Sequence, residues 1–159
     1  MTTERPTVEV LRKEFRYNPL TGELLRSNGK NACKPMNKGY LNVYFRGNTH
    51  KAHILAWAIH YGAYPKQLLD HVNRIRTDNR ICNLREATPE QNCRNAKLRR
   101  DNTSGHKGVW WHSQSGKWEA VVRVNRKQKV VGRFKIKEDA VKARIAAAEK
   151  QYKEFASHE

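Results

Sequence analysis

The chain has 159 residues, enough for one ordinary domain or two small ones. It carries 32 Lys and Arg residues against 15 Asp and Glu, which leaves a formal net charge of +17. A charge of this sign and size indicates a polyanionic partner, either a nucleic acid or an anionic membrane surface. The longest strongly apolar run covers residues 54–59, far short of the roughly 20 residues of a membrane-spanning helix, so a spanning segment is excluded.

The cysteines and the basic residues narrow the class further. Cys33, Cys82 and Cys93 stand far apart and make no CxxC pair, which argues against a disulfide framework and a four-cysteine zinc site. We therefore expect a reducing, cytoplasmic compartment. The N-terminus is not followed by an apolar run, so we do not expect a secretory signal. The basic residues are spread along segments with apolar and aromatic pattern, so we expect folded modules that face phosphate rather than a basic tail. Charge alone leaves open a ribosomal-type basic protein without catalytic chemistry.

Local signals predict the elements of the first 62 residues. Val8, Leu11 and Phe15 share a helical face, and Thr7 can cap that helix. The next predicted elements are a turn at 18–22, a strand at 23–26, a loop at 30–38, an alternating strand at 39–46, a hairpin turn at 47–48 leading into 49–51, and a helix at 53–61 that Gly62 ends.

The middle of the chain predicts two strands followed by a helix. The strands are expected at residues 67–72 and 81–85, with a polar loop between them. Thr88 at the cap and Pro89 at the first helical position predict a helix that runs to about residue 99. Residues 101–105 are polar and turn-rich, which makes them the candidate domain boundary.

The C-terminal part predicts three strands and a helix. The strands are expected at residues 107–112, 118–124 and 129–134. In the second strand, alternation puts Trp118 and Val122 on an apolar face and Glu119 and Arg123 on the other. The helix begins near residue 137, and its apolar stripe is formed by Val141, Ile145, Ala148, Tyr152 and Phe155.

Chemistry is expected where the two middle strands and their helix meet. His71 ends the first strand, Asn83 lies in the second, and Asn92 lies in the first turn of the helix. Hydrolysis of a phosphodiester needs a base, a divalent cation and fixed geometry. His71 suits the base, because its unperturbed pKa lies near 6.5. Asp70 and Asn92 offer hard oxygen ligands that suit Mg²⁺ or Mn²⁺, and Asn83 suits an orienting residue.

The run from about Val10 to Asn95 resembles the HNH homing endonucleases of phages and bacteria. The segments that carry the resemblance are 15–24, 39–40, 52–56, 69–72, 78–85 and 90–92. The resemblance implies a nuclease with one metal ion per active site, His71 as the base, and Asp70 and Asn92 as metal ligands. It leaves open whether His53 supports the site or simply packs in its helix, and whether Asn79 supports the site or forms a turn.

The segment from about residue 104 to 156 resembles the plant ethylene-response-factor, or APETALA-type, DNA-binding domain. Its carrying motifs are Gly108-Val109-Trp110-Trp111, Lys117-Trp118-Glu119-Ala120 and Gly132-Arg133-Phe134. Arg123 matches a DNA-contacting arginine of that family, while Trp110 and His112 stand where the plant domains hold arginine. We expect Trp111 and Trp118 to pack in the core. Arg126, Lys129 and Arg133 belong to a basic stretch that suits binding to phosphate. On which face of the third strand Lys129 lies is left open.

The prediction is an α+β chain with two domains. Residues 1–100 form a ββα-metal (HNH) nuclease domain with its core at about 67–99, and residues 101–159 form a three-stranded antiparallel sheet packed on one helix. We expect a metal-dependent endonuclease acting on double-stranded DNA, with no membrane and no small-molecule substrate. It would be cytoplasmic, in a bacterial or phage-infected cell, and a monomer, or a dimer where both strands are cut.

Three alternatives stay open. The first is a non-catalytic DNA-binding regulator with an HNH-like fold, and the second is an RNA-binding basic protein. Binding to a membrane surface is the third, but the sequence offers no basic amphipathic helix with exposed large apolar residues.

Overall fold

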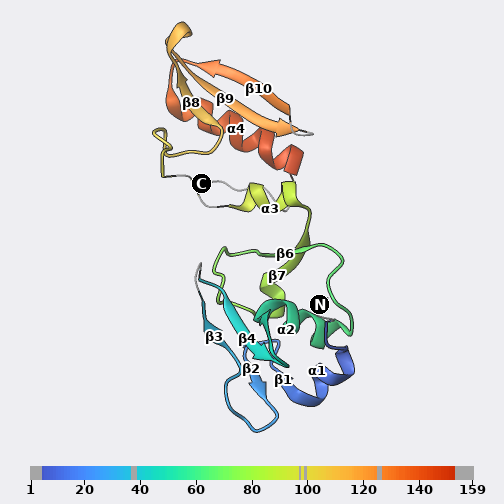
Figure 1. Ribbon diagram of the computed structural model, residues 1–159. Helices are drawn as coiled ribbons and strands as arrows, with labels where there is room; N and C mark the ends of the chain where they lie inside the picture. The colour runs from blue at the N-terminus through green and yellow to red at the C-terminus, as the bar shows by residue number, and fades with distance from the viewer. Residues whose placement is uncertain (1–4, 37–38, 97, 99, 125–126, 153–159) are drawn as a thin grey trace. The chain divides into compact units, whose positions relative to one another are not determined.

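The structure is a computed structural model, and it describes residues 5–36, 39–96, 98, 100–124 and 127–152. The chain divides into two compact units, Met1–Thr88 and Pro89–Glu159. Figure 1 shows the helices and antiparallel strands of both units, which confirm the mixed α+β class. The domain boundary expected between residues 100 and 101 stays a prediction. Among the described residues, no helix is long and apolar enough to cross a membrane.

The elements of the first unit follow one another closely in the sequence. In chain order they are α1 (Val8–Glu14), β1 (Phe15–Tyr17), β2 (Leu24–Arg26), β3 (Lys34–Pro35), β4 (Leu41–Phe45), β5 (Asn48–Lys51), α2 (Ala52–Tyr61), β6 (Leu68–His71), the 3₁₀ turn η2 (Ile81–Asn83) and β7 (Leu84–Ala87). The strands pair antiparallel as β1-β2, β3-β4-β5 and β6-β7.

The first unit has one apolar core built from its helices and hairpins. Thr7 caps α1 as expected, since its side chain accepts a hydrogen bond from the Val10 N–H at 3.4 Å. The core cluster is formed by Leu11, Phe15, Leu24, Ala32, Val43, Phe45, Ala52, Leu55 and Ala58. Within it, the rings of Phe15 and Phe45 meet edge to face at 5.1 Å. This core joins α1 and α2 to the β4 hairpin.

Two local expectations for the first unit are wrong in detail. The hairpin turn is formed by Arg46 and Gly47, both with positive φ, instead of residues 47–48. This left-handed pair suits a two-residue hairpin, whose twist matches that of the flanking strands. The expected loop at 30–38 contains the short strand β3, which pairs with β4. The prediction for α2 is confirmed, including its end at Gly62, which has a φ of 75°.

The second unit is a three-stranded sheet with a helix on one side, as predicted. Its elements are α3 (Pro89–Asn95), β8 (Val109–His112), the 3₁₀ turn η3 (Ser113–Ser115), β9 (Lys117–Val124), β10 (Lys127–Phe134) and α4 (Lys137–Tyr152). The strand order is β10-β9-β8, and Figure 1 shows α4 lying along this sheet. Val109 and Ala120 of the sheet pack against Ala140 of α4, and Val122 packs against Ala148 and Tyr152.

Four expectations for the strands and helices from residue 81 onward are corrected. Residues 81–83 form a 3₁₀ turn, so Asn83 precedes the second strand and does not lie in it. Helix α3 ends at Asn95, earlier than expected. On α4 the expected Ala148 and Tyr152 are buried and Val141 packs against the core, but the buried positions nearer the start of the helix are Ala140 and Arg144, one residue before the expected Val141 and Ile145. Trp111 is 51% exposed, although its ring meets that of Trp118 at 5.4 Å. Phe155 and Arg126 lie outside the described residues.

Candidate active site

Asp70 and His71 lie at the end of β6, where β7 pairs with it. Both side chains are buried, and in the antiparallel register Asp70 stands opposite Arg85 and His71 opposite Leu84. The Asp70 carboxylate accepts hydrogen bonds from Nε and one terminal nitrogen of Arg85, at 3.1 and 3.0 Å. This ion pair compensates the burial of the carboxylate, which alone in an apolar site would be costly.

His71 has a defined hydrogen-bond partner. Its Nε2 lies 3.1 Å from the side-chain oxygen of Asn79, and both residues are buried. Because an amide oxygen only accepts, Nε2 carries the hydrogen and the basic nitrogen of the ring is Nδ1. Burial lowers the pKa of His71 below its ordinary value of 6.5, against smaller opposing effects of Asn79 and Asp70. His71 is therefore unprotonated at neutral pH.

Asn83 closes the loop that follows His71. Its side-chain oxygen accepts from the Asn73 N–H at 2.9 Å, and its amide group donates to the Asp78 carbonyl oxygen at 2.8 Å. The backbone carbonyl of Asn83 also accepts from the Val72 N–H at 2.9 Å. One buried side chain thus joins the start and the end of the loop.

The N-terminal part of the chain supports the same loop. The Tyr17 hydroxyl donates to the Asn79 carbonyl oxygen at 2.7 Å, and burial raises the pKa of Tyr17, so this donor stays protonated. The Pro19 carbonyl accepts from the Ile81 N–H at 3.1 Å. The turn at residues 18–22 therefore packs on the segment that carries Asn79.

Sequence reasoning left the role of Asn79 open and did not assign Arg85 or Tyr17 to the site. Asn79 stands in a polar Asp78-Asn79-Arg80 run that is typical of turns, and only its burial and its contact with His71 distinguish it. Arg85 stands opposite Asp70 because of the strand register. A signal for Arg85 was present in the sequence, since antiparallel pairing of residues 67–72 with the following strand brings a basic residue opposite an acidic one.

Asn92 lies exposed on α3, which is grouped with the second unit. Its meeting with Asp70 and His71 thus stays a prediction. In the part of the chain that the structure describes, no group of three or more His, Cys, Asp or Glu side chains is placed to hold a metal ion. A carboxylate and a side-chain amide oxygen are nevertheless hard donors, which is the chemistry that Mg²⁺ and Mn²⁺ accept when water fills the remaining positions.

The sheet of the second unit presents one face away from α4. The register puts Trp110 beside Glu119 and Glu119 beside Arg133, so these three share that face with His112 and Arg123. Arg133 Nε donates to the buried Glu119 carboxylate at 2.6 Å. The His112 ring contacts Ser115 in the η3 turn, and its Nε2 lies 3.4 Å from the Arg133 guanidinium.

A β-bulge settles on which side Lys129 lies. The register of β10 shifts between Val130 and Gly132, so Val130 and Arg133 share the outer face. Lys129 pairs with Val122, whose side chain packs toward α4, and Lys129 therefore lies on the opposite side from Arg133.

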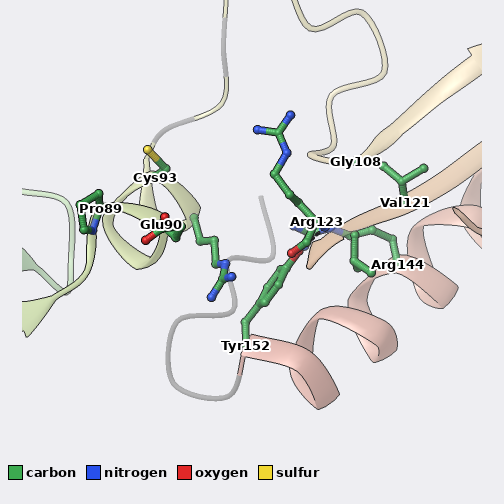
Figure 2. A pocket seen from close by; sticks show the side chains of 10 residues that line it. Pro89, Glu90, Cys93, Gly108, Val121, Arg123, Arg144 and Tyr152 are labelled. Carbon is green, nitrogen blue, oxygen red and sulfur yellow. Dashed lines mark hydrogen bonds between the residues drawn. The ribbon is translucent and has the colours of Figure 1, made fainter. Parts of the chain in front are cut away.

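The second unit also contains a cavity of about 370 Å³, lined in part by Arg94, Arg123, Arg144 and Tyr152. Figure 2 labels Arg123 of β9 and Arg144 and Tyr152 of α4 among the lining residues, and Arg94 belongs to α3. The Tyr152 hydroxyl accepts from the Arg123 N–H at 2.6 Å and donates to the Arg123 carbonyl at 3.0 Å. These two bonds fix the backbone of Arg123, whose side chain is exposed.

Comparison with known proteins shows that the chain belongs to the HNH endonuclease family. Residues 50–94 match the model of HNH endonucleases. Protein 3.8 of Escherichia phage T7 is 33% identical over 94 residues, a match that covers 58% of this chain and 75% of that protein. Among solved structures, the HNH homing endonuclease I-HmuI is similar with a TM-score of 0.44 and 16% identity, over 95% of this chain and 92% of that chain. The family predicted from the motifs around Asp70 and His71 is confirmed, whereas the resemblance of the C-terminal segment stays a prediction.

Proposed function

We propose that the chain is a metal-dependent DNA endonuclease of the homing type, in which His71 acts as the general base. The observation that carries this proposal is the state of His71. It is buried at a strand end, unprotonated at neutral pH, and fixed through Nε2 on Asn79. A base must be within reach of water, unprotonated and held in one orientation. Burial keeps His71 unprotonated, and its bond to Asn79 favours one orientation of the ring.

His71 takes a proton from the attacking water through Nδ1, while Asn79 keeps the opposite nitrogen occupied. Asn83 orients the base through the loop, because its bonds to Asn73 and Asp78 fix the segment that follows His71. Mg²⁺ or Mn²⁺, held by Asp70 and Asn92, would stabilise the charge on the scissile phosphate and the leaving oxygen. Arg85 holds the Asp70 carboxylate in place.

Double-stranded DNA is the proposed substrate. The net charge of +17 favours a polyanion, and membership of an endonuclease family favours nucleic acid over a lipid surface. The second unit acts as the DNA-binding module of APETALA type, with Trp110, His112, Arg123 and Arg133 on the outer face of its sheet. Arg126 and Lys129 are proposed as further phosphate contacts outside that face. One active site per chain suits a cytoplasmic monomer that nicks, and cutting both strands needs a second copy or a second event.

The test is a plasmid-nicking assay with Mg²⁺ or Mn²⁺. Purified protein should convert supercoiled DNA to the nicked form, EDTA should stop the reaction, and His71→Ala should lower the rate at least 100-fold while DNA binding persists. His60→Ala is a matched control, because His60 lies exposed on α2. A His71→Ala variant that nicks as fast as the wild type would overturn the assignment of the base, and preference for structured RNA in competition binding would overturn the substrate.

A further inference from the structure

His53 is a buried histidine beside the proposed base. It lies on α2, only 3% exposed, in a part of the chain far from the Asp70-His71 pair in sequence. Its ring meets that of His71 at a centroid distance of 5.0 Å and an interplanar angle of 75°. Tyr40 lies against both rings, at 5.3 Å from His53 and 6.1 Å from His71. The three rings form one cluster, which we call the ring cluster.

His53 can act on its neighbours only by packing its ring against them, and not through a hydrogen bond from Nδ1 or through a charge. Its Nδ1 is buried and has no hydrogen-bond partner among the residues that the structure describes. A buried nitrogen without a hydrogen-bond partner lowers the stability of the folded state, so a phenylalanine at this position should make the protein more stable. Burial, with smaller effects of His71 and Lys51, lowers the pKa of His53 to about 3, so the ring is uncharged at neutral pH.

The ring of His71 needs such a neighbour to keep one orientation. Rotation about the Cβ–Cγ bond of a histidine is broad and roughly two-fold, so a single hydrogen bond restrains it weakly. A half-turn of the ring about this bond would withdraw Nε2 from Asn79 and would put the carbon Cδ2 where the basic nitrogen Nδ1 had been. Two rings packed against His71 oppose this turn, because it would drive ring atoms into their van der Waals surfaces.

We propose that His53 is a positioning residue for His71, whose ring packing holds the imidazole in the orientation that keeps Nε2 on Asn79. This inference rests on the proposed function of His71 as the base. Lys51 and Arg76 lie over the Tyr40 ring, at 5.2 and 4.8 Å from its centroid, and hold the third ring of the cluster in place. His53 itself transfers no proton.

The test compares His53→Ala, which removes the ring, with His53→Phe, which keeps it. His53→Ala should lower kcat 10- to 100-fold with KM unchanged, because the base is misoriented while DNA binding is intact. His53→Phe should stay within about threefold of the wild type and melt at a higher temperature, because the unpartnered nitrogen is gone. His60→Ala, on the exposed side of the same helix, serves as the control.

A second readout needs no nuclease activity. Two-bond ¹H–¹⁵N NMR of ¹⁵N-histidine-labelled protein at pH 7.5 separates the two neutral tautomers, and the signal of His71 is assigned by its loss in His71→Ala. The wild type and His53→Phe should show one His71 tautomer with the hydrogen on Nε2, and His53→Ala should show a mixture.

Full activity and a single tautomer in His53→Ala would overturn the inference. So would a His53→Phe variant as slow as His53→Ala with an unchanged His71 tautomer. If His71→Ala keeps wild-type activity, the proposed function fails while the NMR result still decides the packing role.

Discussion

Gly22 packs directly against the backbone of Arg80. A Cβ atom at Gly22 would lie 2.6 Å from the Arg80 nitrogen and 2.7 Å from the Asn79 carbonyl carbon, closer than any side chain tolerates. The glycine also has a φ of 77°, a conformation that costs other residues energy. A turn near the N-terminus thus sets the position of the segment that carries Asn79, the hydrogen-bond partner of His71.

Replacing Gly22 by alanine should therefore damage both stability and activity. The new methyl group must push residues 79–80 away, and this should cost more than 2 kcal/mol on top of the roughly 1 kcal/mol of a left-handed alanine. Nicking should fall with it, since Asn79 moves. Chemical denaturation and the plasmid assay measure the two effects.

Gly29→Ala is the matched control. Gly29 has nearly the same φ, 79°, but nothing lies within 4 Å of the Cβ it would gain. It should lose only the conformational energy and keep full activity. Equal losses in the two variants would show that the contact with Arg80 contributes nothing.

The ion pair between Arg85 and Asp70 leads to a prediction about how Mn²⁺ affects the stability of a variant that lacks Arg85. Arg85→Met should destabilise the protein by about 3 kcal/mol, because the buried Asp70 carboxylate loses its cationic partner. If Asp70 binds the divalent ion, Mn²⁺ then replaces the missing charge and should raise the melting temperature more in this variant than in the wild type. Arg80→Met, which breaks the pair of an exposed arginine with the partly buried Asp78, should lose less stability than Arg85→Met and show no extra response to Mn²⁺.

Two arginines on the outer face of the second unit should behave differently. Arg123 is exposed, so Arg123→Ala should weaken DNA binding, reduce the salt dependence of binding by about one ion, and leave stability unchanged. Arg133→Ala should cost about 2 kcal/mol of stability, because Glu119 is buried and loses its ion pair. Fluorescence anisotropy over a salt series and thermal denaturation separate the two. A stability loss at Arg123 equal to that at Arg133 would contradict the assignment.

His53 makes stability depend on pH. Its folded pKa of about 3 lies below the unfolded value near 6.5, so between these values the unfolded chain binds a proton that the folded chain excludes. Stability should therefore fall as pH drops through this window, by about 1.4 kcal/mol per pH unit. Urea unfolding at pH 6 and pH 4 checks this, and the loss should shrink in His53→Phe. Parallel slopes in the two proteins would show that His53 does not carry the effect.

Local sequence signals predicted those helices and strands whose conformation depends on residues close together in the sequence. The Thr7 cap, the helical spacing around Leu55 and the left-handed Gly62 defined α1 and α2, and alternation defined β4 and β9. Prediction failed where distant segments decide the conformation. Asn83 lies in a 3₁₀ turn because its side chain bonds to Asn73 and Asp78, and Lys129 takes its side of the sheet from a bulge opposite β9.

By itself, the sequence determined the class of the protein and its chemical groups. The charge, the Asp70-His71 pair and the spacing to Asn83 and Asn92 indicate a nuclease of the HNH family, because residue type and order suffice for such a motif. Only the tertiary structure decided which neighbours control those groups. Asn79, Arg85 and His53 reach Asp70 or His71 through a loop, a strand register and a helix, and contacts across such distances in the chain exist only once the core has packed.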